Sequence, residues 1–89
     1  MSTSKANNKI LLEVYVPSIE KEYDVFVPIS KRIGTIKTLI ERGILDLASD
    51  GFQIKEDSNF YSKTTGQIYD VNSKIIDTDL KNGSRIILI

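Results

Sequence analysis

The sequence contains no cysteine and no histidine. Without cysteine the chain can form no disulfide, thiolate nucleophile, zinc–thiolate site or iron–sulfur site. Without histidine it lacks the commonest metal ligand and the only side chain whose unperturbed pKa lies close to neutral pH. These absences exclude much of enzyme chemistry. We therefore expect no catalytic residue, no cofactor and no metal site.

An excess of charge of either sign is also missing, since 12 Lys and Arg balance 12 Asp and Glu. Nucleic-acid binding depends largely on a basic surface that neutralises phosphates, so this balance argues against a nucleic-acid partner. The nearest basic group is interrupted by Glu41 and is interpreted as a solvated helix face. Its members are Lys31, Arg32, Lys37 and Arg42.

Long hydrophobic runs are absent as well. No window approaches 18 consecutive apolar residues, which predicts no direct membrane insertion. The polar start of the chain does not resemble a signal peptide, and we expect a cytoplasmic protein. Residues 1–8 are predicted to be a flexible tail and residues 9–89 a single domain. A chain of 89 residues buries only about 60–65 % of its unfolded surface, which favours a small binding module over an enzyme with a deep cleft.

Two segments show the period-two alternation of half-buried strands. Residues 10–17 and 22–28 are joined by four mostly polar residues, which predicts a hairpin. The period then changes to three and four, which indicates a helix. Its apolar stripe consists of Ile33, Ile36, Ile40, Ile44 and Leu47, widened by Leu39. Ser30 is the expected N-cap of this helix and Gly43 its expected C-cap.

The second half of the chain shows weaker patterns. We expect a turn at Asp50-Gly51, a short strand over residues 59–62, another over 67–70, and one helical turn over 77–80 that brings Leu80 into the core. Residues 85–89 form a strongly apolar last strand, suited to parallel pairing with residues 10–17 at the sheet centre. The order predicts an α+β fold: a β-grasp, or ubiquitin-like, arrangement with a mixed four- to five-stranded sheet packed on one helix.

Several short motifs resemble those of bacterial ubiquitin-like proteins of the YukD/EsaB group. These motifs are Val27-Pro28 followed by Ile33 and Ile36, then Thr65-Gly66-Gln67, and the ending Leu80-Lys81-Asn82-Gly83-Ser84-Arg85-Ile86. Proteins of this group are encoded with type VII (WXG100) secretion systems. The resemblance implies an accessory or regulatory protein whose partner is a component of such a system.

The final strand bears on covalent chemistry. Ubiquitin-type modifiers and sulfur carriers need a flexible tail that ends in Gly-Gly, whereas this sequence ends on the strand residue Ile89. We therefore expect a non-conjugated protein. Two alternatives stay open: a modifier or sulfur carrier whose Gly-Gly tail lies beyond this sequence, and an unrelated β-grasp adaptor.

The alternation also predicts a protein-binding surface on the outer face of the sheet. Tyr15, Ile87 and Ile89 are expected to form an apolar patch there, with Leu11 as a further member. Phe26 is expected to point outward at the sheet edge. The patch could instead be covered by residues 50–59 or be buried in a homodimer. The acidic pair Asp77 and Asp79 is explained more simply by helix capping than by cation binding.

Overall fold

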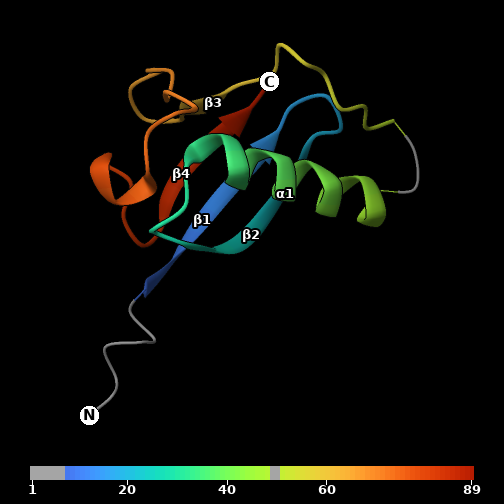
Figure 1. The fold of residues 1–89 in the computed structure, drawn as a ribbon. Helices are drawn as coiled ribbons and strands as arrows, with labels where there is room; N and C mark the ends of the chain where they lie inside the picture. Colours follow the sequence, from blue (N-terminus) through green and yellow to red (C-terminus); the bar gives the residue numbers. More distant parts are fainter. Residues whose placement is uncertain (1–7, 49–50) are drawn as a thin grey trace.

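The computed structural model describes residues 8–48 and 51–89, and in these residues one helix lies across one face of a four-stranded sheet (Figure 1). The elements are β1 Lys9–Val16, β2 Lys21–Pro28, α1 Ile33–Leu47, β3 Phe60–Ser62, the 3₁₀ helix η2 Ile75–Asp77 and β4 Ser84–Leu88. The predicted tail, residues 1–8, lies outside the described residues except for Asn8, and so does Asp50 of the predicted turn. No helix of the described residues has the length and apolar character needed to cross a bilayer.

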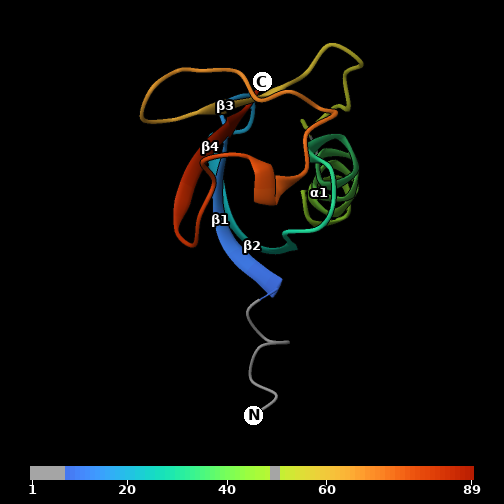
Figure 2. The same ribbon diagram turned by 60° about the vertical axis from the view of Figure 1, so that its left-hand side comes forward.

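The strand order is β2-β1-β4-β3, and β1 and β4 are parallel neighbours at the centre. β1 pairs with β2 in an antiparallel hairpin, and β3 pairs with β4 in antiparallel fashion. The predicted hairpin and the predicted parallel central pair are therefore confirmed. Turned by 60°, the molecule shows α1 on one side of the sheet and the opposite face free of helix (Figure 2).

The core lies between α1 and the inner face of the sheet. Most of its members come from alternate positions of the strands and from one side of the helix, as the two periods predict, whereas Ile75 comes from η2 and Phe52 from the segment after α1. They are Leu12, Val14, Val16, Val27, Ile33, Ile36, Ile40, Ile44, Phe52, Phe60, Ile75, Ile86 and Leu88. Leu80 is half-buried and packs against this cluster, as expected.

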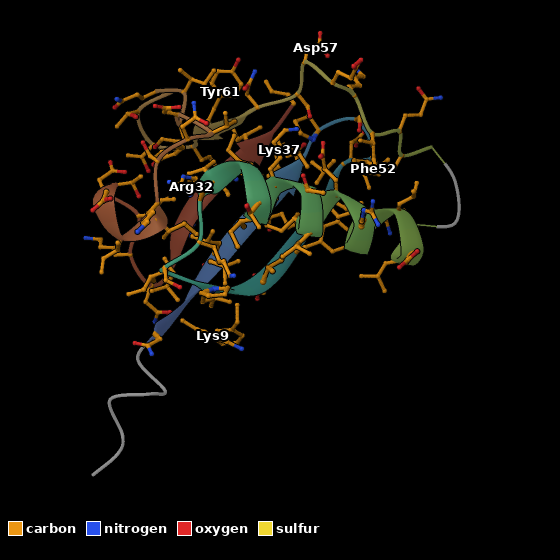
Figure 3. The ribbon with its side chains drawn as sticks, in the orientation of Figure 1. Lys9, Arg32, Lys37, Phe52, Asp57 and Tyr61 are labelled. Atoms are coloured by element: carbon orange, nitrogen blue, oxygen red, sulfur yellow. The ribbon has the colours of Figure 1, made fainter. Side chains whose placement is uncertain are left out.

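The predicted N-cap at Ser30 is wrong. The helix begins at Ile33 after Arg32, and no side chain caps its first turn (Figure 3 labels Arg32). The amide of Ile33 instead donates to the carbonyl of Ser73 at 2.8 Å, and that of Gly34 donates to the carbonyl of Val71 at 2.9 Å. A Cβ at position 34 would stand 3.1 Å from that Val71 oxygen, so glycine permits this close approach. Helix amides need acceptors, and here a distant loop supplies them.

The predicted helix end is also wrong. Gly43 lies inside α1, which continues to Leu47, and the amide of Ala48 donates to the carbonyl of Ile44 at 2.7 Å. The stripe is narrower than predicted, because Leu39 is 58 % exposed and Leu47 is 73 % exposed. Both leucines lie on the flank of α1 that faces β2, at the open edge of the sheet.

A buried carboxylate fixes the segment that follows α1. Glu41 is 3 % exposed, accepts a 2.7 Å hydrogen bond from the Ser58 hydroxyl, and lies 3.3 Å from the Lys37 ammonium. Phe52 from the same segment is buried in the core. Figure 3 labels Lys37 on α1 and Phe52 on the segment that leads to β3. Residues 51–59 are thus anchored on the helix side of the molecule.

Two predicted elements of the second half are corrected. The helical turn occupies Ile75–Asp77 rather than residues 77–80, because Ile75 is the fully buried residue of this stretch. The strand over residues 67–70 reduces to one bridge, between Tyr61 and Ile68. The hydroxyl of Ser62 accepts from the amides of Thr64 and Thr65, so local turn bonds hold this hairpin.

Candidate protein-binding surface

The outer face of the sheet carries apolar side chains that meet across the strands. Tyr15 of β1 pairs with Ile87 of β4, Ile87 pairs with Tyr61 of β3, and Tyr61 forms the bridge to Ile68. Paired residues on neighbouring strands share a face. Tyr15 and Ile87 alternate with fully buried residues, which places this face opposite α1. We call Tyr15, Ile87, Tyr61 and Ile68 the outer apolar row.

Ile89 stands just beyond this row. Its amide donates to the carbonyl of Asn59 at 3.1 Å, and the Asn59 amide donates to the carbonyl of Ile89 at 2.8 Å. It follows the end of β4 at Leu88, and it also lines a small cavity with Phe52 and Ser58 of the segment that follows α1. Its side chain is 55 % exposed. Of the four predicted surface residues, Tyr15 and Ile87 are therefore direct neighbours on the outer face, and Ile89 stands at the end of β4 beside them in sequence.

Leu11 lies apart from them. A row of charged residues crosses the outer face between Leu11 and Tyr15: Glu13 pairs in register with Asp24 on β2 and with Arg85 on β4. The Arg85 Nε lies 3.3 Å from a Glu13 carboxylate oxygen. On the far side of this charged row, Leu11 faces Phe26, which is 68 % exposed. The predicted surface is thus divided into an apolar row and a smaller Leu11–Phe26 pair.

A cation borders the outer apolar row. The Lys63 ammonium lies 5.2 Å from the centroid of the Tyr15 ring and 3.4 Å from a carboxylate oxygen of Glu22. A cation over an aromatic face is attracted by the ring's electron density. The outer apolar row, which contains two tyrosines, is therefore bordered by charged residues.

Two members of the row were missed by the sequence reasoning. Tyr61 alternates with the buried residues Phe60 and Ser62, and this alternation was readable from the predicted strand over residues 59–62. Ile68 joins the row only through its bridge to Tyr61, which no local pattern reveals. Tyr61 is labelled in Figure 3 on β3.

The segment expected as a possible cover lies elsewhere in its described part. Residues 51–59 are held to α1 by the Ser58–Glu41 hydrogen bond and by burial of Phe52 in the core. At the end of the segment, the backbone of Asn59 pairs with that of Ile89. These contacts lie at the helix side and at the end of β4, and they leave the outer apolar row half-exposed.

The other candidate residues engage in contacts within the chain. Asp79 accepts a 2.9 Å hydrogen bond from the Tyr69 hydroxyl, and burial together with this carboxylate raises the pKa of Tyr69. Of the basic group, Arg32 donates to the carbonyl of Asn72 and Lys37 pairs with Glu41. Across residues 8–48 and 51–89, no group of three Asp, Glu, His or Cys residues is placed to hold a metal ion.

Comparison with known proteins shows the fold. No family model matches this chain, and no curated protein matches it. Its structure is similar to a ubiquitin-like domain of Arabidopsis thaliana, with TM-score 0.70 and 18 % identity over 100 % of this chain and 84 % of that one. It is also similar to the ubiquitin of Caldiarchaeum subterraneum, with TM-score 0.66 and 10 % identity over 91 % of each chain.

A third similar structure is a chain of the MycP5-free ESX-5 inner membrane complex. The TM-score is 0.70 at 8 % identity, over 92 % of this chain and 21 % of that one, so this chain spans about a fifth of its length. At such identities the likeness concerns the fold alone. The predicted α+β, ubiquitin-like β-grasp fold is thereby confirmed.

Proposed function

We propose that this chain is a non-catalytic, non-conjugated ubiquitin-like protein that binds a partner through the outer apolar row and Ile89. The observation that carries the proposal is the cross-strand pairing of Tyr15, Ile87 and Tyr61 on the face of the sheet opposite α1, where all three stay partly exposed. Aromatic and aliphatic side chains gathered on a small surface and bordered by charges are typical of partner sites.

A second observation supports a rigid binding surface. β4 pairs on both sides, with β1 and with β3, and its residues Ile86 and Leu88 are buried. The sheet therefore holds the side chains of the outer apolar row in fixed positions. The absence of histidine and cysteine from the sequence supports a non-catalytic role.

We further propose that the partner is a component of a type VII secretion system in the cytoplasm of a bacterium, which this chain serves as an accessory or regulatory subunit. The support is the resemblance of the Leu80–Ile86 ending and of the Thr65-Gly66-Gln67 turn to the YukD/EsaB group. In the structure, the amide of Gly83 donates to the carbonyl of Leu11 at 2.8 Å. The Leu80–Ile86 segment therefore fixes the point at which β4 begins to pair with β1.

The test is quantitative affinity capture from cells of the source organism, with the wild-type chain and two variants. Ile87→Asp places a charge in the outer apolar row, and we expect it to fold cooperatively and to lose the partner. Ile76→Asp is the matched control, because Ile76 is 60 % exposed and lies on η2, outside the sheet.

Each outcome of the capture has a defined meaning. Recovery of secretion components by the wild type and by Ile76→Asp, but not by Ile87→Asp, supports both parts of the proposal. Capture without any secretion component contradicts the type VII assignment, and equal capture by Ile87→Asp contradicts the surface. A wild-type dimer that Ile87→Asp converts to a monomer in sedimentation velocity would assign the surface to self-association.

A further inference from the structure

A second apolar surface lies between β2 and α1, at the open edge of the sheet. It is a groove of about 280 Å³ whose helix wall includes Leu39, Gly43 and Leu47 and whose strand wall includes Val25 and Phe26. Leu39 and Leu47 of the helix wall are among the most exposed large hydrophobic residues of the described chain, and so is Phe26, whose side chain lies on the outer face of β2. None of the residues that line the groove belongs to the outer apolar row.

Along this groove, the outer edge of β2 pairs with no other strand of residues 8–48 and 51–89. β2 ends the strand order, with β1 as its neighbour on one side. The Ile29 amide donates to the carbonyl of Asn8 at 2.8 Å, and the same register continues along the hairpin. Because antiparallel hydrogen bonding alternates, the amides and carbonyls of Glu22, Asp24 and Phe26 are turned to the free edge. Unpaired groups of this kind can pair with an added strand.

We propose that this groove binds an extended segment of a partner protein, which pairs with β2 as a fifth strand and alternates apolar residues with lysine or arginine. Side chains of an added strand alternate between two faces. One set would pack on the helix wall at Leu39, Gly43 and Leu47. The other set would lie on the outer face beside Glu22, Asp24 and Phe26.

The charges along β2 favour a basic segment. Among the residues that line the groove, Asp24 is the charged one, and within the described ranges it forms no salt bridge. Glu22 shares its face two residues earlier, and its contact with Lys63 is exposed and 3.4 Å long, which makes it weak. Lysine or arginine opposite these acids would gain charge complementarity across the new strand pair.

The same charges disfavour a second copy of this chain in the groove. An antiparallel β2–β2 pair centred on Asp24 sets that carboxylate against its own copy. The next register toward the start of β2 sets Glu22 against Asp24. The next register toward its end brings Pro28, which has no amide hydrogen, into a hydrogen-bonding position.

Gly43 contributes no side chain to the helix wall, which leaves space in the groove at this position. Glycine is a poorer helix former than any residue except proline, yet Gly43 lies in the interior of α1. A Cβ built at this position meets nothing within 4 Å, so no packing inside the chain requires glycine there. A larger side chain would instead extend into the groove, and this makes position 43 suited to a decisive test.

The first experiment titrates the ¹⁵N-labelled chain with three capped peptides: alternating lysine and valine, alternating glutamate and valine, and the lysine–valine composition in two blocks. We expect the alternating basic peptide to shift the amide signals of Glu22, Asp24, Phe26 and the Leu39–Leu47 turns. Its affinity should exceed that of the other two peptides by about tenfold, the equivalent of about 1.4 kcal/mol. Asp24→Lys should reverse the preference between the two alternating peptides.

The second experiment compares Gly43→Leu with Gly43→Ala. Both should raise the thermal midpoint of unfolding, but only Gly43→Leu should abolish binding of the basic peptide, so the loss cannot be attributed to misfolding. Ile76→Asp should bind like the wild type. Full affinity in Gly43→Leu, equal affinity for both alternating peptides, or a β2-mediated dimer without peptide would overturn the proposal. The outer apolar row shares no residue with this groove, so either proposal can fail alone.

Discussion

The two faces of the sheet are organised along different directions. The inner face is built from every second residue of a strand. In β1, Leu12, Val14 and Val16 are buried there, and the residues between them point to the outer face. On the outer face, residues of the same kind pair across neighbouring strands. The apolar residues Tyr15 and Ile87 form one row, and the charged residues Glu13 and Arg85 form the row beside it. The residues of the inner face can thus be predicted from each strand by itself. The rows of the outer face can be predicted only when the register between four segments is known.

The largest effect should separate two neighbouring isoleucines of β4. Ile86 is fully buried, so Ile86→Ala removes core contacts and leaves a cavity, which we expect to lower the free energy of unfolding by about 3 kcal/mol. Ile87 is half-exposed on the outer apolar row, and Ile87→Ala should cost about 1 kcal/mol or less. Urea unfolding of both variants gives the values. Equal losses would mean that the two faces do not differ as described.

A smaller effect should come from the polar anchor behind α1. Ser58→Ala removes the hydroxyl that donates to the buried Glu41 carboxylate, and we expect a loss of about 1–2 kcal/mol. The control is Ser30→Ala, at the predicted cap that the structure does not use, where the change should stay within about 0.5 kcal/mol. A greater loss of unfolding free energy in Ser30→Ala than in Ser58→Ala would indicate that Ser30 caps the helix after all, as the sequence predicted.

Smaller still is the expected effect of the charged row. Glu13 and Arg85 are exposed enough for solvent to screen their pair, so a double-mutant cycle should give a coupling of about 0.2–1 kcal/mol that shrinks as salt is raised. A coupling well above this range, or one insensitive to salt, would show that the row stabilises the fold rather than bordering a surface.

The smallest effect concerns alkaline pH. Burial, and next the hydrogen bond and charge of Asp79, raise the pKa of Tyr69 above its ordinary value of 10.0. A raised pKa means that this tyrosine contributes stability below pH 10 and that the contribution is lost as pH rises through its folded-state pKa. Tyr69→Phe should therefore flatten the decline of unfolding free energy above pH 10. An unchanged slope in the variant would contradict the assignment.

The sequence predicted what depends on short-range periodicity. The hairpin, the helix stripe through Ile36 and Ile40, and the apolar last strand all follow from spacing along the chain. The errors arose where distant segments act on each other. Carbonyls of residues 71 and 73 replace the expected Ser30 cap, and no local pattern could reveal that. The candidate surface was found in part, since Tyr15 and Ile87 follow from alternation, whereas Ile68 joins them only through tertiary pairing.

The most direct test of the proposed surface is an NMR comparison of the labelled chain alone and bound to the captured partner. The account predicts that the side-chain signals of Tyr15, Tyr61, Ile68 and Ile87 shift, while those of Ile76 on η2 and of the buried Ile86 change least. Shifts confined to the groove between β2 and α1, with the outer apolar row unperturbed, would contradict it.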